Sequence, residues 1–295
     1  MPGMHTLTRW ILLWATPLIC AAWVSGCVPI PAGAQMGLRS PDPLPDDAAG
    51  PGPSPTPTGA AGALAAAEAA SPDPPAPPDW RALPSFGADG RPLLYLTFDD
   101  GPVPRTTQPI LDLLDANGAK ATFFVLGYNV KKYPGLIRDT LSRGHAIANH
   151  SWDHTRLVGL RPDQVLTQIS RNDAAVLAAA GDLVRGGNRP RFLRPPFGAE
   201  DDSVRELAAG LGYGTILWTL DAKDWQQPDA SVIVDRIMRG AHPGAVVLLH
   251  DAGGGRAQTI RALELVLPKL REAGYNLCAI TEPTASTASL PPAER

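Results

Sequence analysis

Short apolar runs alternate with longer amphipathic segments from about residue 93 to residue 280. The short runs are almost continuously apolar, which predicts buried strands, whereas apolar residues at helical spacing in the longer segments predict helices. The predicted strands are 93–98, 121–126, 146–148, 191–194, 215–220, 245–249 and a last one near Cys278; the predicted helices are 108–116, 134–142, 162–180, 202–211, 231–238 and 259–273. Buried strands that alternate with amphipathic helices favour a parallel sheet covered on its faces. About seven such units favour a barrel over an open sheet.

The segments on either side of this pattern differ from it in composition. Residues 27–79 are dominated by Pro, Ala, Gly and Asp, with almost no aromatic or β-branched residues. Such a segment cannot bury enough apolar surface to offset the entropy lost on ordering. Residues 283–295 are rich in Ser, Thr, Ala and Pro. We therefore expect a disordered linker at 27–79, one folded domain at 80–282 and a disordered tail at 283–295.

The first 26 residues resemble an export signal. Arg9 precedes an apolar stretch, 10–24, which is shorter than the roughly 20 apolar residues that a membrane span needs. The stretch ends in Val24-Ser25-Gly26-Cys27, which is similar to a bacterial lipobox. This resemblance implies cleavage before Cys27 and lipid on that cysteine, and two or more acyl chains would hold the protein stably at a membrane. The alternatives are an ordinary signal peptide or an uncleaved anchor, with an incidental cysteine.

Charge and cysteine content exclude some classes of partner and site. The formal net charge is -3 and the chain has no run of Lys or Arg, which argues against nucleic acid as a partner. Cys20, Cys27 and Cys278 lie too far apart for a disulfide framework or a zinc knuckle. Cys278 falls in an apolar run, and we expect it to be a buried strand thiol.

Polar clusters stand at the ends of five predicted strands. They are Phe98-Asp99-Asp100-Gly101-Pro102, His150-Ser151-Trp152-Asp153-His154, Arg194-Pro195-Pro196-Phe197-Gly198, the segment 221–225, and Leu248-Leu249-His250-Asp251. The C-terminal ends of parallel strands meet at one rim, where such folds carry their chemistry. We therefore expect these carboxylates, imidazoles and the arginine to lie close together.

The first two clusters indicate a metal site. Asp99 and Asp100 precede a Gly-Pro turn, so both carboxylates can reach one pocket, although a solvated turn capped by Asp is the simpler reading. His150 and His154 are four residues apart, which can place both imidazoles on one side of a helical turn, a common spacing of metal ligands. Taken alone, this spacing is as often incidental.

The other three clusters add groups for catalysis. After Arg194 and two prolines, the next free amides are those of Phe197 and Gly198, and either could face a developing oxyanion. Trp225, beside Asp221 and Asp224, can form one wall of a small pocket or stack on a sugar. His250 could be a third metal ligand, a general acid or a capped strand end. Together, the five clusters suit metal-assisted hydrolysis of a carbonyl compound.

These motifs closely resemble those of the polysaccharide deacetylase family, the carbohydrate esterases that contain the NodB homology domain. The resemblance covers about 93–280 and includes Thr97-Phe98-Asp99-Asp100-Gly101-Pro102, His150-Ser151-x-x-His154, Arg194-Pro195-Pro196-Phe197-Gly198, Asp221-x-x-Asp224-Trp225 and Leu248-x-His250, in that order. It implies a distorted (β/α)₇ barrel, in agreement with the count of strand–helix units.

The resemblance also implies a role for each residue of the site. Asp100, His150 and His154 would bind a divalent metal, usually zinc, with cobalt or another divalent ion as alternatives. Asp99 would be the general base, held by Arg194, and His250 the general acid, oriented by Asp224. Trp225 and Leu248 would line the pocket for the acetyl methyl group. Phe197 stands where the family often has tyrosine; its backbone amide would serve the oxyanion hole, so only a contact of the tyrosine hydroxyl with substrate is in doubt.

The activity expected from the resemblance is metal-dependent removal of N-acetyl groups from an envelope polysaccharide. N-acetylglucosamine of peptidoglycan is the expected substrate, because an exported domain, lipid-anchored to the outer face of the membrane through Cys27, would face the cell wall. The alternatives are an O-acetyl esterase acting on sugars such as xylan, a deacetylase of chitin or exopolysaccharide, and a non-catalytic lipoprotein that binds glycan.

Overall fold

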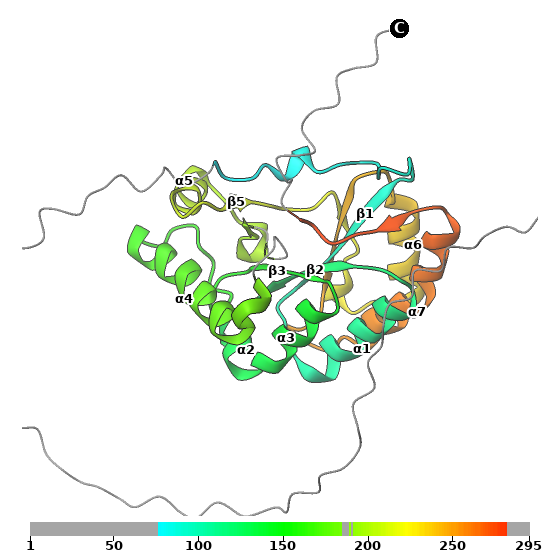
Figure 1. Ribbon diagram of the computed structural model, residues 1–295, viewed down its shortest axis with the longest axis horizontal. Helices are drawn as coiled ribbons and strands as arrows, with labels where there is room; N and C mark the ends of the chain where they lie inside the picture. The colour runs from blue at the N-terminus through cyan, green and yellow to red at the C-terminus, as the bar shows by residue number, and fades with distance from the viewer. Residues whose placement is uncertain (1–75, 185–188, 190, 282–295) are drawn as a thin grey trace, which may run out of the picture. The chain divides into compact units, whose positions relative to one another are not determined.

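The computed structural model describes residues 76–184, 189 and 191–281 (Figure 1). The predicted export signal at 1–26, Cys27, most of the linker at 27–79 and the tail at 283–295 lie outside these residues, so these assignments stay predictions. Within the described ranges, no helix is both long enough and apolar enough to cross a membrane.

Strands and helices alternate along most of the described domain. In chain order they are β1 (Leu93–Asp99), α1 (Pro104–Ala116), β2 (Ala121–Val125), α2 (Gly127–Lys132), α3 (Pro134–Ser142), β3 (Ala146–Asn149), α4 (Pro162–Ala180), β4 (Phe192–Leu193), α5 (Asp202–Gly210), β5 (Gly214–Thr215), β6 (Leu220–Asp221), α6 (Ala230–Gly240), β7 (Ala245–His250), α7 (Ala257–Glu272) and β8 (Asn276–Leu277). Short 3₁₀ turns lie at Trp80–Ala82, Gly181–Val184, Pro196–Gly198 and Asp224–Gln226.

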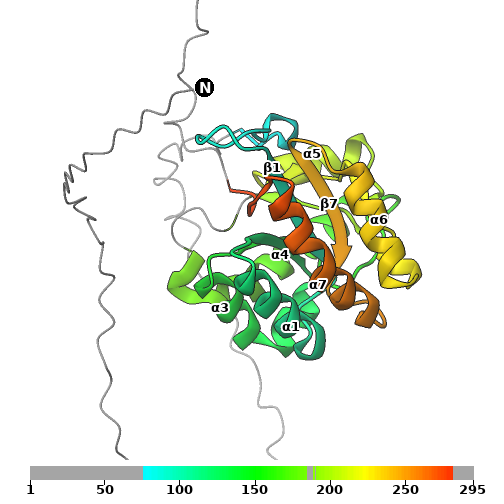
Figure 2. The same ribbon diagram turned by 90° about the vertical axis from the view of Figure 1, so that its right-hand side faces the viewer.

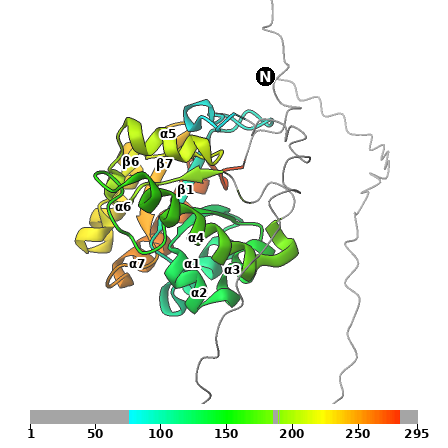
Figure 3. The ribbon, with the colours of Figure 1, turned by 90° about the vertical axis from the view of Figure 1, so that its left-hand side faces the viewer.

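One parallel sheet curls into the barrel. Its strand order is β5-β4-β3-β2-β1-β7-β6, and β8 pairs with the first residues of β1. The two edge strands, β5 and β6, are joined by only four residues, 216–219, which can span at most about 18 Å between them. The edges of the sheet must therefore lie close together, and the helices cover its outer face, as Figures 2 and 3 show. This architecture confirms the predicted distorted (β/α)₇ barrel.

The prediction of one strand over 215–220 was wrong. The apolar run Ile216-Leu217-Trp218 has the composition of a strand, but its two ends bond to opposite edges of the sheet. Ile216 donates its amide to the Leu193 carbonyl (2.9 Å) of β4, whereas Thr219 donates to the Val246 carbonyl (3.0 Å) of β7. The segment therefore bridges the opening of the barrel instead of extending one strand.

Two helices also differ from the predictions. α1 begins at Pro104, four residues before the predicted start, because proline suits the first helical position and the Thr107 hydroxyl accepts the Val103 amide (2.8 Å). The short helix α2 was not predicted, since its six residues are too few for a recognisable amphipathic period.

The alternation of side chains along β1 assigns each residue to one of two cores. Leu94, Leu96 and Phe98 pack in the layer beneath the helices, whereas Leu93 and Tyr95 belong to a second cluster with residues of β2, β3, β4 and β7. A cluster shared by five strands of a curled sheet is the interior of the barrel. Because side chains alternate, the next inward positions of these strands are occupied by Thr97, Asp99, His150, Arg194, Leu248 and His250. The predicted site residues thus lie at the C-terminal mouth of the barrel.

Candidate metal and catalytic site

The turn after β1 brings two consecutive carboxylates into one cavity. In a regular strand Asp99 and Asp100 would point to opposite faces, but Asp100 has a φ of 80°, in the left-handed region. This conformation costs a non-glycine residue about 1–2 kcal/mol. The side-chain amide of Asn129 donates to the Asp100 carbonyl (2.7 Å), and the backbone amide of Gly101 donates to Asp251 Oδ1 (3.0 Å). These two bonds fix the turn. Both carboxylates therefore line the same cavity.

The two histidines lie in a loop and not in the helical turn that their spacing suggested. Ser151 and His154 have φ values of 71° and 66°, and these left-handed residues fold the chain back so that both imidazoles face Asp100. His150 Nδ1 lies 2.7 Å from the Arg194 carbonyl. A carbonyl oxygen only accepts, so Nδ1 carries the proton and the lone pair of Nε2 faces the cavity.

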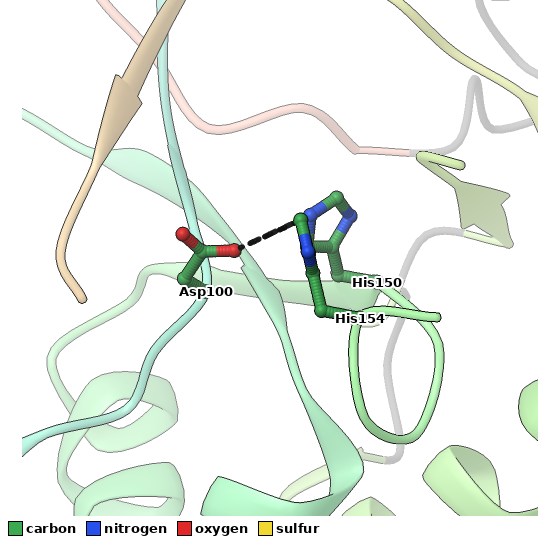
Figure 4. Close-up of side chains that lie close together, drawn as sticks. All are labelled: Asp100, His150 and His154. Atoms are coloured by element: carbon green, nitrogen blue, oxygen red, sulfur yellow. Dashed lines mark ion pairs between the residues drawn. The ribbon is translucent and has the colours of Figure 1, made fainter. Parts of the chain in front are cut away.

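Asp100, His150 and His154 form a cluster that could hold a metal ion. Asp100 Oδ1 lies 3.6 Å from His150 Nε2 and 3.4 Å from His154 Nε2, and one ligand atom of each residue lies within 4.8 Å of the others (Figure 4). Asp100 Oδ1 is buried without a hydrogen-bond partner in the described part of the chain. Burial, with the nearby His150 imidazole, lowers the pKa of His154 and favours the neutral form that binds metals. One carboxylate and two imidazoles fit a zinc-like divalent ion.

Arg194 holds the second carboxylate, Asp99. The Arg194 side chain is fully buried, and its Nη1 donates to Asp99 Oδ1 and to Thr97 Oγ1, both at 2.8 Å. Nη2 donates to the Leu217 carbonyl (2.8 Å) of the segment that closes the barrel. Burial lowers the pKa of Arg194, and the charge of Asp99 opposes this effect. Asp99 Oδ2 is left facing the metal cluster, 3.7 Å from His150 Nε2.

His250 and Asp224 form a second charged pair on the other side of the cavity. His250 Nδ1 lies 2.7 Å from Asp224 Oδ1, while Asp224 Oδ2 accepts the His250 amide (3.0 Å) and the Thr259 hydroxyl (2.8 Å). Burial by itself lowers the pKa of His250, but the bond to Asp224 and the charges of the surrounding carboxylates outweigh it and raise that pKa. His250 is thus suited to carry a proton at neutral pH.

The structure distinguishes between the two amides that could face an oxyanion. The Gly198 amide already donates to the Pro195 carbonyl (3.0 Å). The Phe197 amide has no such bond to any described residue, so it is the free donor at this turn. Phe197 has a φ of 63°, and its ring, 64% exposed, packs edge-on against His154 with 4.4 Å between the centroids.

The cavity between these groups has a volume of about 440 Å³. Leu248 is buried in its wall and Trp225 is half exposed at its edge. Three further lining residues, Trp218, Gly253 and Arg256, were not predicted. Trp218 packs so closely against Gly198 that a Cβ there would lie 2.7 Å from its ring. The buried Arg256 donates to the carbonyls of Ala252 (2.6 Å) and Gly253 (3.1 Å).

Neither Trp218 nor Arg256 had a clear signal in the sequence, since one lies in an apolar run and the other follows three glycines. The two other histidines among the described residues, His145 and His242, lie outside the cavity. His145 is fully buried at the start of β3, where burial lowers its pKa to about 4 and its Nδ1 accepts the Ala121 amide (3.2 Å). Cys278, expected to be a buried strand thiol, is only partly buried and follows the last residue of β8.

Comparison with known proteins identifies the family. Residues 87–216 match the family model described as polysaccharide deacetylase. The chain is also 36% identical over 192 residues to a peptidoglycan-N-acetylglucosamine deacetylase of Bacillus cereus. The aligned region covers 64% of this chain and 87% of the relative. The chain belongs to the polysaccharide deacetylase family.

Other members of the polysaccharide deacetylase family resemble the chain to a similar degree. A chitooligosaccharide deacetylase of Sinorhizobium fredii is 34% identical, over 66% of this chain and 93% of that protein. The solved structure of the peptidoglycan deacetylase PdaC from Bacillus subtilis matches with a TM-score of 0.58 and 35% identity, over 64% of this chain and 88% of that one. This member of the family therefore has relatives that are named for peptidoglycan and a relative that is named for chitooligosaccharides.

Proposed function

We propose that this polysaccharide deacetylase is a metal-dependent N-deacetylase that converts N-acetylglucosamine of an envelope glycan to glucosamine, with release of acetate. The observation that carries the proposal is the cluster of Asp100, His150 and His154, flanked within one cavity by the Arg194–Asp99 pair and the His250–Asp224 pair. Water must attack the amide carbon while the nitrogen leaves as an amine, which requires one group to accept a proton and another to donate one.

Asp100, His150 and His154 are the proposed metal ligands, and zinc is the proposed metal. A divalent ion held there supplies a Lewis acid and lowers the pKa of water. Asp99 is the proposed general base, because Oδ2 faces the cavity while Oδ1 is held by Arg194. With Oδ1 fixed, Oδ2 has one orientation from which to take a proton from the attacking water.

His250 is the proposed general acid. Its Nδ1 is occupied by Asp224, so Nε2 is the nitrogen that can donate a proton to the leaving amine. The free Phe197 amide is the proposed donor to the oxyanion that develops when the carbonyl carbon becomes tetrahedral. Leu248 and Trp225 supply an apolar wall for the acetyl methyl group. In enzymes generally, loss of a general acid such as the proposed His250 lowers the rate by about 10²–10⁴-fold.

Peptidoglycan is the proposed polymer. Relatives named as peptidoglycan deacetylases support it, although the chitooligosaccharide deacetylase of Sinorhizobium fredii supports a neutral glycan equally well by identity. The lipobox-like sequence ending at Cys27 favours peptidoglycan, because a lipid-anchored protein outside the membrane would meet the cell wall. A cleaved, lipid-bearing Cys27 is therefore part of the proposal.

The purified full chain tests the reaction. We expect acetate release from peptidoglycan and from N-acetylglucosamine oligomers, loss of release with a chelator, and recovery on addition of zinc. Asp99→Asn should abolish release, whereas Asp235→Asn, which neutralises an exposed carboxylate on α6, should not. Release from O-acetylated xylan alone would favour the esterase alternative. No release from any of these substrates with metal present would exclude a deacetylase.

A separate experiment tests the location. Cells that express the chain are labelled with a fatty acid, and the label should appear in the wild-type protein but not in Cys27→Ala. The membrane fraction should contain the wild type, and Cys27→Ala should be released from it. A labelled Cys27→Ala protein would rule out lipid at this cysteine.

A further inference from the structure

A second groove opens beside the metal cluster, between the start of α1 and the end of α2. It has a volume of about 440 Å³ and is lined by Val103, Pro104, Arg105, Asn129, Lys132 and Tyr133, which we call the cationic groove. The side chains of Arg105 and Lys132 are exposed at the surface, and Lys132 Nζ lies 5.2 Å from the centre of the Tyr133 ring. The groove thus combines two cations with an aromatic ring, and no carboxylate residue lines it.

The cationic groove is directly connected to the proposed catalytic site. Asn129, which lines the groove, donates to the Asp100 carbonyl (2.7 Å), and Val103 follows Asp100 by only three residues, which span at most about 11 Å. α1 follows β1, whose C-terminal end carries Asp99 and Asp100, and α2 follows the neighbouring strand β2, so groove and cavity open at the same rim of the barrel. A polymer bound in the cavity can therefore reach the groove with a neighbouring unit.

The charges of the groove are available to a ligand. Among the described residues, no carboxylate lies within 4 Å of the charged atoms of Arg105 or Lys132, whereas Arg143, which follows the last residue of α3, contacts three aspartates. Asp221 lies in the wall of the cavity, so a carboxylate of a ligand would be repelled by this side chain and attracted at the groove.

We propose that Arg105 and Lys132 bind a carboxylate of the glycan whose N-acetyl group occupies the cavity. This inference rests on the proposed function and specifies its substrate: an anionic glycan in preference to a neutral one. In peptidoglycan each N-acetylglucosamine is linked to a sugar with a lactyl group, which bears a carboxylate or a peptide with carboxylates of its own. Chitin oligomers carry neither. Exposed pairs of this kind contribute little individually, so the groove selects among glycans and is not required for the reaction.

Binding of glycans to a catalytically inactive variant tests the groove independently of turnover. The full chain with Asp99→Asn is titrated calorimetrically with three ligands of equal sugar length: chitin oligomers, glycan strands stripped of peptide, and strands that retain their peptides. We expect tighter binding of at least one anionic ligand, by about three- to tenfold relative to chitin, and a smaller difference as ionic strength rises. Preference for stripped strands assigns the lactyl carboxylate, and preference for peptide-bearing strands alone assigns the peptide.

The variant Arg105→Gln/Lys132→Gln should remove this preference. Its matched control is Lys269→Gln/Arg271→Gln, which removes two exposed cations from the last turn of α7, at the other end of the barrel. An unchanged preference in the groove variant, an equal loss in the control, or equal binding of all three ligands by the parent would overturn the inference. Acetate release by the protein with Asp99 intact tests the proposed function separately, so either idea can fail while the other stands.

Discussion

His250 Nδ1 lies 2.7 Å from Asp224 Oδ1, and this pair sets the protonation of the proposed acid. Although burial opposes it, the carboxylate raises the pKa of His250, so the protonated imidazole persists to a higher pH and is lost as pH rises through that pKa. Asp224→Asn should lower this pKa and move the alkaline limb of kcat/KM to lower pH by about one to two units. A pH profile of acetate release measures the shift.

Thr259→Val is the control for this shift. It removes the hydroxyl that donates to Asp224 Oδ2 but retains the negative charge beside His250. Its alkaline limb should move by much less than that of Asp224→Asn. If both variants keep the wild-type profile while their rates fall, His250 does not deliver the proton and Asp224 has only a structural role.

Asp251 joins the strand of His250 to the turn that contains the proposed metal ligand Asp100. Its Oδ1 accepts the Gly101 amide (3.0 Å) and its Oδ2 accepts the Thr107 hydroxyl (2.5 Å). Asp251→Ala leaves a buried amide without a partner, which should lower the free energy of unfolding by about 1–3 kcal/mol and weaken metal binding. Thr107→Val removes the bond to Asp251 and the bond from the Val103 amide but leaves the Gly101 amide paired, so its stability should lie between those of the wild type and Asp251→Ala. Urea denaturation with a chelator present measures stability; equal stability of all three proteins would contradict this role.

Asp251 should also make stability depend on pH. Burial raises its pKa to about 7, above the value near 4 of an unfolded chain, so the folded state binds the proton more tightly. The stabilisation from this proton is fully present below about pH 4 and is lost as pH rises to about 7. Asp251→Asn, which has no such proton, should lose less stability between these pH values than the wild type. If the urea midpoints of the wild type and Asp251→Asn change in parallel with pH in the absence of metal, Asp251 does not make stability depend on pH.

Much of the site could be predicted because strands impose a period of two. Thr97, Asp99, Leu248 and His250 share the inward face of the barrel with Tyr95, so the apolar pattern alone indicates which polar residues meet at its mouth. The motifs then indicate what these groups can do. The parallel barrel was predictable for the same reason, since its strands and helices have clear and different periods.

What the sequence could not give depends on local backbone conformation and on contacts distant in the chain. Nothing in the residue types shows that Asp100 and His154 adopt left-handed conformations, which alone turn them toward each other. The apolar run through Trp218 has the composition of a strand, and only its bonds to opposite sheet edges make it a bridge. Arg105 and Lys132 are separated by a strand and a helix, so their common groove is a product of the fold.

Arg194 and Asp99 should behave as one energetic unit. Both side chains are buried, so Arg194→Met leaves Asp99 without its counter-ion and should lower the free energy of unfolding by about 3–5 kcal/mol. Asp99→Asn removes the charge from the other side. The double variant should lose less unfolding free energy than the sum of the losses in the two single variants, by about 0.5–3 kcal/mol, because each mutation already removes the same interaction. Strictly additive losses in urea denaturation would show that the pair is not coupled.

Gly253 should affect the proposed metal site through steric contact alone. A Cβ there would lie 2.3 Å from Asp100 Oδ2, so Gly253→Ala forces the carboxylate out of its present position relative to the two imidazoles without changing any charge. We expect metal affinity, measured by competition with a chelator, to fall about 10–100-fold, as when other supports of a metal ligand are removed. The thermal stabilisation by added zinc should fall with it, since a ligand of the folded state stabilises by an amount that grows with the logarithm of its concentration relative to Kd.

Gly90→Ala separates this steric effect from backbone strain. Gly253 and Gly90 have nearly equal φ values, 73° and 76°, but no atom lies within 4 Å of a Cβ at Gly90. Both variants should lose about 1 kcal/mol of stability from the left-handed conformation, and only Gly253→Ala should lose metal affinity. Equal metal affinity in the two variants would show that Asp100 Oδ2 can move without disturbing the site, and the cluster would then depend on Oδ1 and the two histidines alone.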